Sequence, residues 1–151
     1  MRSLQLSFAI ASLAVLGTVA LPWFSQAASP SAVPYRVVVN PQNRTASVDR
    51  KFVADVFLKK VTRWPDGEAA RPVDLSPDAA PRAHFSDEIL RRSVSAVKNY
   101  WQQMVFSGRE VPPPELETDE EVVRYVLRFP GGIGYLSGGA NVERVKVLTV
   151  R

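Results

Sequence analysis

Apolar residues with strand-like or helix-like spacing form successive blocks along the chain. A run rich in β-branched residues at 35–39 stops at Asn40-Pro41, which predicts a buried strand. Apolar residues then recur at helical spacing, so we expect a helix that is capped by Ser47 or Asp49 and runs through Leu58. The apolar face of this helix consists of Phe52, Val53, Val56 and Phe57.

The middle of the chain continues this alternation. Residues 71–75 predict a short second strand, and a helix is expected from Pro81 to residue 91 or 92, since proline is tolerated in a first helical turn. Another helical pattern starts at residue 93 or 95 and runs through Phe106, after which Gly108 ends it.

The last part of the chain holds the clearest helix start. Pro112-Pro113-Pro114 must be extended, and Thr118 with Glu121 then forms a capping box that begins a helix through Phe129. Strands separated by helices predict an α/β layer fold around one mixed or mostly parallel sheet. The two remaining apolar runs predict strands at 133–136 and 145–150.

The turn "VTRWPDG" carries an indole that a turn does not require. Pro65-Asp66-Gly67 reverses the chain after the first helix. Trp64 either packs across this turn, between the helix that carries Phe52 and Phe57 and the sheet, or contacts a ligand. We favour the packing role.

The N-terminal residues have the pattern of an export signal. Arg2 precedes an apolar run from Leu4 to Leu21, and Ser25-Gln26-Ala27 fits a cleavage site, which predicts a signal peptide at 1–27 and a periplasmic or secreted protein. The rival interpretation is an uncleaved membrane anchor, because the run is about long enough to span a bilayer. A Ser/Pro/Ala tether at 28–34 and one α/β domain at 35–151 follow.

Composition narrows the range of functions. The chain has no cysteine, so disulfides and Cys-ligated metals are excluded. Its formal charge of +4 is spread along the chain, and together with the export signal this argues against nucleic acid as a partner.

An enzyme is not expected. His84 is the only histidine and lies on a predicted helix among charged residues, where an exposed structural position is the usual one. The paired carboxylates at 87–88 and 119–121 fall in the first part of predicted helices, where they offset the helix dipole. We therefore expect no catalytic residue, no metal site and no cofactor. Anion binding by free amides at helix starts is the chemistry that remains, in the loops at 40–47, 76–82 and 93–95.

Several stretches, in this order, resemble the phosphate-binding-protein-like family, the periplasmic substrate-binding components of phosphate ABC transporters. These are "VVVNPQN", "DVFLKKVTRWPDG", Arg82 with Phe85, and "FPGGIGYLSGGA". The resemblance runs from Val37 to Leu148 and is similar to the family's short, single-lobe members. It implies one α/β lobe of a periplasmic binding protein.

The same resemblance implies a ligand and partners. Phosphate or another oxyanion would be held by main-chain amides and polar side chains, with a transporter permease or another envelope protein as partner. On this basis Asn40, Ser76, Asp78 and Arg82 are the candidate ligand-binding residues, and the Arg82 guanidinium could meet an oxyanion with two hydrogen bonds.

One position departs from the family pattern. The ligand loop of the family carries Ser-Gly-Thr before a helix, and Ala79-Ala80-Pro81 stand here. Both hydroxyls are missing and Pro81 has no N–H, which predicts weaker phosphate binding by several kcal/mol at roughly 0.5–3 kcal/mol per lost bond. The alternative function is a ligand-free interaction module built on the same lobe. The proline-rich loop at 111–117 is then either an extended docking segment or a rigid spacer.

Overall fold

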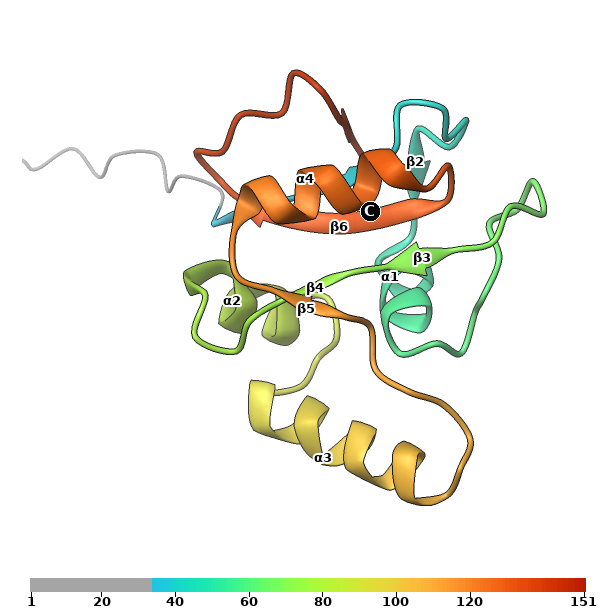
Figure 1. The fold of residues 1–151 in the computed structure, drawn as a ribbon, viewed down its shortest axis with the longest axis vertical. Helices are drawn as coiled ribbons and strands as arrows, with labels where there is room; N and C mark the ends of the chain where they lie inside the picture. The colour runs from blue at the N-terminus through green and yellow to red at the C-terminus, as the bar shows by residue number, and fades with distance from the viewer. Residues whose placement is uncertain (1–33) are drawn as a thin grey trace, which may run out of the picture.

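A computed structural model describes residues 34–151 and shows helices packed on both faces of a small sheet (Figure 1). The predicted signal at 1–27 and nearly all of the predicted tether at 28–34 lie outside the described residues, so both stay predictions. None of the helices within residues 34–151 has the length and apolar character needed to cross a bilayer.

The central sheet has the strand order β3-β6-β1-β7. β1 (Tyr35–Val39) pairs antiparallel with β6 (Gly132–Ser137), and Val37 lies opposite Tyr135. β3 (Arg71–Pro72) runs parallel to β6 on its other side, while β7 (Lys146–Val147) runs antiparallel to β1. The predicted α/β fold with a mixed sheet is therefore confirmed, and its central pair of strands is antiparallel.

Two predicted strands are each divided into two pieces. The run at 71–75 forms β3 and then β4 (Asp74–Leu75), which leaves β6 and pairs with β5 (Glu115–Leu116). The C-terminal run forms β7 and then β8 (Thr149–Val150), which pairs with β2 (Ser47–Val48). In both runs the chain changes its hydrogen-bonding partner midway. The prediction of one continuous strand in each run was therefore wrong.

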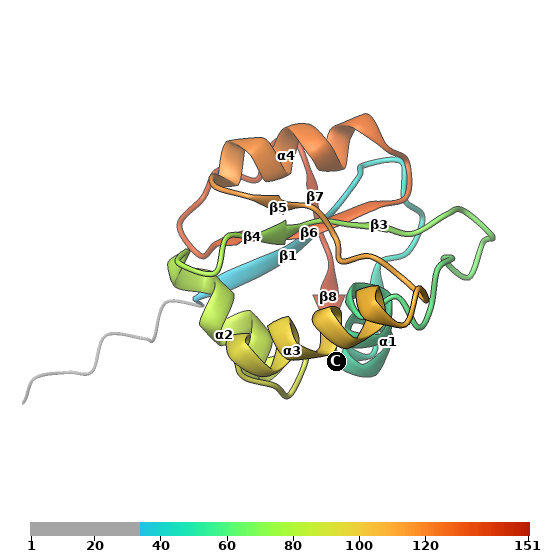
Figure 2. The ribbon, with the colours of Figure 1, turned by 60° about the horizontal axis from the view of Figure 1, so that its bottom comes forward.

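The helices lie in two layers, and Figure 2 shows α4 on one side of the sheet and α1, α2 and α3 on the other. α2 ends at Glu88, short of the predicted residue 91 or 92, and Arg91 then adopts a positive φ of 53° that no helix interior allows. The bounds are α1 (Arg50–Phe57), α2 (Ala80–Glu88), α3 (Val94–Phe106) and α4 (Asp119–Arg128).

At two of the three helix starts for which a cap was predicted, the predicted side chain makes the capping hydrogen bond. The Ser93 hydroxyl accepts a hydrogen bond from the Ala96 amide, and the Thr118–Glu121 capping box is complete. The α1 cap differs, because Asp49 is the N-cap residue without a side-chain bond and Ser47 lies in β2. Phe129 is extended, so α4 ends one residue before the predicted Phe129.

The core fills both sides of the sheet. On the α2 side, the Phe85 ring stacks on Tyr135 with 3.9 Å between ring centroids. On the α4 side, Gly134 lets the helix approach closely, since a Cβ there would lie 2.6 Å from Val122 Cγ1. The core is thus continuous through the sheet, and all of its buried apolar residues lie within 35–148.

The packing role expected for Trp64 is confirmed. Its side chain is buried, its ring centroid lies 5.4 Å from that of Phe52 in α1, and its Nε1 donates to the Gly131 carbonyl at 3.0 Å. The indole therefore joins α1 to the segment that leads into β6.

Candidate ligand-binding loop at the start of α2

The loop before α2 is the position that the sequence favours for an anion, and most of its amides already have partners. The Ala79 amide donates to the Ser76 carbonyl at 3.0 Å, and the Arg82 amide donates to the Ala79 carbonyl at 2.9 Å. Pro81 has no amide hydrogen. Ala80 is then the one residue between Ala79 and Arg82, all within the described chain, whose amide has no protein acceptor.

The Arg82 guanidinium points into the protein. The side chain is buried, its Nη1 forms an ion pair with Asp74 Oδ1, and the same nitrogen donates to the Leu75 carbonyl at 3.0 Å. Its Nη2 lies 3.6 Å from Glu115 Oε1. An arginine in these contacts has its charge matched by carboxylates of β4 and β5.

Tyr135 completes this buried cluster. Its hydroxyl donates to Asp74 Oδ1 at 2.5 Å from the neighbouring strand β6. Burial raises the pKa of Tyr135 above its ordinary value, and the nearby Asp74 carboxylate raises it further, so the phenol keeps its proton. Burial lowers the pKa of Arg82, but its interactions with Asp74 and Tyr135 together outweigh this effect and raise the pKa, so the guanidinium stays charged. The three side chains thus form one ion-pair network inside the lobe.

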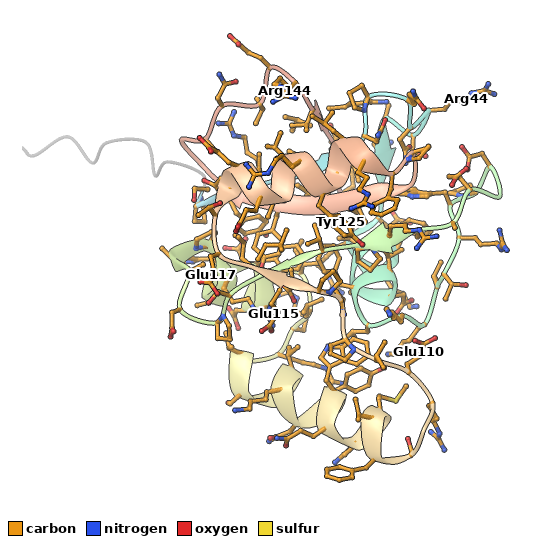
Figure 3. The ribbon with its side chains drawn as sticks, in the orientation of Figure 1. Arg44, Glu110, Glu115, Glu117, Tyr125 and Arg144 are labelled. Carbon is orange, nitrogen blue, oxygen red and sulfur yellow. The ribbon has the colours of Figure 1, made fainter. Side chains whose placement is uncertain are left out.

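A hollow of about 300 Å³ opens beside Ala79, Ala80 and Pro81, and its other wall is acidic. Glu117 and Asp119 line it from the start of α4. The Asp119 carboxylate accepts the Ser137 amide at 2.9 Å, whereas Glu117 is exposed. Figure 3 shows Glu115 and Glu117 along the β5 segment beside α2. The surface around the loop therefore carries negative charge.

Asn40 lies away from this loop. Its Nδ2 is within 3.0–3.2 Å of the carbonyls of Val126, Leu127 and Phe129, and its Oδ1 accepts the Gln42 amide at 2.8 Å. Asn40 therefore caps the C-terminal end of α4, whereas the hollow lies at the N-terminal end of that helix, about 15 Å away at 1.5 Å per residue.

The four predicted ligand residues are thus divided by the structure. Ser76 and Asp78 lie in the loop before α2, the first buried and the second exposed, and Arg82 lies in the first turn of α2 as part of the ion-pair network. Asn40 is not brought to them. No observation tests whether any of the four binds a ligand, so that assignment stays a prediction.

In the other two candidate anion loops, polar side chains of the loop already bond to neighbouring groups of the same segment. In the loop at 40–47, Asn43 Oδ1 accepts the Thr45 amide at 2.8 Å. At 93–95, the Ser93 hydroxyl caps α3 and lies 3.0 Å from the Ser95 hydroxyl. These contacts are those of ordinary caps and turns.

Asp74 and Tyr135 are the residues that sequence reasoning missed. A carboxylate between apolar neighbours in "PVDL" was the available signal, because a charge inside a buried strand requires a partner. His84 is exposed, and the described part of the chain holds no group of three His, Cys, Asp or Glu side chains that could bind a metal ion.

No protein-family model and no curated protein matches the sequence. Solved structures do match the fold, among them an ABC-type phosphate transport receptor from Vibrio cholerae, with a TM-score of 0.60 and 13% identity over 78% of this chain and 46% of that one. A putative phosphate ABC transporter substrate-binding protein with bound phosphate from Clostridium perfringens matches with a TM-score of 0.61 and 15% identity, over 78% of this chain and 44% of that one. PstS from Borrelia burgdorferi matches with a TM-score of 0.59 and 10% identity, over 78% of this chain and 47% of that one.

The chain spans slightly less than half the length of each of these proteins. At these identities the likeness concerns the fold alone. The chain therefore has the α/β fold of part of a phosphate ABC transporter substrate-binding protein, as the sequence resemblance implied.

Proposed function

We propose that this chain is an exported binding lobe without enzymatic activity that acts by contacting another component of the cell envelope, such as a transporter permease or a membrane surface. In this proposal the lobe by itself does not capture phosphate with high affinity. The observation that carries it is the inward orientation of Arg82, whose guanidinium is paired with Asp74 instead of facing the loop.

The energetic reason concerns the arginine. Breaking a buried ion pair by removing one partner costs about 3–5 kcal/mol, because the other charge is left uncompensated. An incoming phosphate would have to draw Arg82 away from Asp74 against a cost of this kind. The guanidinium is therefore a poor anion ligand in this conformation.

The charges around the loop support the same proposal. Glu117 and Asp119 line the hollow, and a phosphate dianion would be repelled by each of these carboxylates. The amides of Asp78 and Ala80 are the main-chain donors left at the start of α2, and each neutral hydrogen bond contributes only about 0.5–1.5 kcal/mol. The few free amide donors and the negative charge around the hollow together favour phosphate binding that is at most millimolar.

Isothermal titration with phosphate tests this proposal on the chain that begins at Ala28. We expect no heat of binding up to millimolar phosphate, with sulfate as a parallel titrant. Micromolar binding would overturn the proposal and restore the oxyanion-receptor function.

Two variants identify the site if phosphate does bind. Ser76→Ala and Asp78→Asn change the loop without breaking the pair between Asp74 and Arg82, so they separate a loss of ligand contacts from a loss of folding. Weaker phosphate binding in both would locate the ligand before α2, as the family resemblance implies.

A further inference from the structure

The end of α3 carries an exposed apolar surface. Val105, Phe106 and Val111 expose 51%, 91% and 60% of their surface, and the other large exposed apolar residue within 34–151 is Val147 at 43%. Val105 and Val111 line the same hollow of about 320 Å³, so they are neighbours in space. We refer to Val105, Phe106 and Val111 as the α3 tip.

This exposure contrasts with the rest of the helix. Val97 and Trp101 are buried against the core, and the Tyr100 hydroxyl donates to the Leu58 carbonyl at the end of α1. The inner face of α3 is therefore packed, while Phe106 forgoes the stabilisation that burying a phenylalanine side chain provides. An apolar cluster of this kind marks an interaction surface.

The helix α3 and the residues that flank it are cationic, with Arg109 beside the tip and Arg91 and Arg92 at the opposite end of the helix. Between residues 91 and 109 the chain carries Arg91, Arg92, Lys98 and Arg109, and no Asp or Glu. Lys98 lies two helical turns before Val105 and therefore on the same exposed face. Glu110 lines the same hollow as Val105 and Val111, and its carboxylate is offset by Lys59, whose Nζ lies 3.6 Å away. The charge of a matching partner is therefore negative.

The position of α3 at an edge of the molecule leaves the exposed Phe106 side chain at its end accessible to a partner. The helix forms one edge of the molecule in Figure 1, on the far side from α4, and Figure 2 places it in the layer with α1 and α2. Exposed aromatic and aliphatic side chains flanked by Lys and Arg are typical of a surface that binds at a membrane interface.

We propose that the α3 tip docks on an anionic lipid surface. Phe106, Val105 and Val111 enter the interface between headgroups and acyl chains, while Lys98 and Arg109 lie near the headgroups. With 13 residues, α3 is too short to span the membrane, and only its tip enters the interface. The inference rests on the proposed envelope location, where the chain meets membranes, and it is independent of phosphate binding at α2.

Vesicle co-sedimentation tests the proposal, with phosphatidylcholine vesicles compared with vesicles that also contain phosphatidylglycerol. The chain from Ala28 on is used, because the apolar run at 4–21 would bind lipid by itself and the described core lies entirely within 35–148. We expect binding to the anionic vesicles that weakens as salt is raised.

Two sets of variants define the contact. Phe106→Ser should weaken binding about tenfold, and Lys98→Gln with Arg109→Gln should weaken it by roughly fivefold per charge. All three side chains are exposed, so folding should be preserved, as circular dichroism would verify.

Matched controls lie at the opposite end of the molecule. Arg44→Gln with Arg144→Gln removes the same net charge, and Figure 3 shows both arginines at the end away from α3. Val147→Ser removes an exposed apolar side chain from β7. These controls should bind vesicles like the unsubstituted chain.

Each other outcome overturns the lipid assignment. Absence of vesicle binding, or equal loss in the tip variants and the controls, would do so. Self-association that Phe106→Ser abolishes, without vesicle binding, would assign the tip to a second copy of the chain. A phosphate titration that shows micromolar binding would overturn the proposed function and leave the vesicle result unaffected.

Discussion

Trp64 joins three parts of the lobe, two through its side chain and one through its backbone. Its ring packs on Phe52 of α1, its Nε1 donates to Gly131 before β6, and its backbone closes the turn by accepting the Gly67 amide at 2.9 Å. A large indole at a turn is thus explained by packing, because the turn is covered by the core.

Trp64→Ala should lower the free energy of unfolding by about 3–5 kcal/mol, since the substitution empties a large buried volume. Trp64→Phe is the matched variant. It keeps an aromatic ring, and the Gly131 carbonyl still accepts the Arg71 amide at 2.9 Å, so its loss should be smaller. Urea unfolding followed by circular dichroism measures both. A Trp64→Ala variant as stable as the unsubstituted chain would contradict the packing role.

At the scale of elements, α4 shows how local sequence fixes a helix start. Thr118 accepts the Glu121 amide at 3.2 Å, and the Glu121 carboxylate accepts the amides of Glu117 and Thr118 at 2.9 and 3.1 Å. These bonds hold the pKa of Glu121 below its ordinary value of 4.5, because they favour the charged form.

A lowered pKa in the folded state means stability that is present above the ordinary value and lost as pH falls through the folded value. The difference in unfolding free energy between the unsubstituted chain and Glu121→Gln should therefore shrink as pH falls below 4.5. Thr118→Ala should cost about 1 kcal/mol at neutral pH. Urea unfolding at several pH values measures the unfolding free energies of the unsubstituted chain and of both variants. Glu120→Gln is the control for removal of a negative charge from the same turn. A difference for Glu121→Gln that is independent of pH would contradict the capping contribution.

Strand extents were less predictable than helix starts. The runs at 71–75 and 145–150 have the composition of single strands, yet each divides between two partners. Composition reports that a segment is extended and buried, whereas the partner and direction of a strand depend on distant segments.

On the scale of the whole molecule, one core connects every layer. α1, α2 and α3 meet through aromatic and aliphatic contacts on one face of the sheet, and α4 packs on the other face through Gly134. α3 contributes Val97 and Trp101 to this core even though its tip is exposed. A shared core of this size favours two-state unfolding.

The chain from Ala28 on contains two tryptophans, and they report on different parts of this core. Trp64 reports on the turn after α1, and Trp101 reports on α3. Fluorescence of the single-tryptophan variants Trp64→Phe and Trp101→Phe should give transitions that coincide with circular dichroism of the same variant. A fluorescence transition of Trp101 that precedes the loss of secondary structure would show that α3 unfolds separately.

The sequence by itself determined the order of the four helices and of the two long strands β1 and β6, the capped starts of α3 and α4, and the resemblance that implied this α/β fold. These features depend on periodicity and on bonds between residues close in the chain, which a sequence states directly. Only the tertiary structure decided that Arg82 faces Asp74 and Tyr135, that Asn40 closes the far end of α4, and that Phe106 lies outside the core. Those facts depend on contacts between distant segments, and the partner of a buried charge or the uncovered side of a helix is fixed only once the layers are packed.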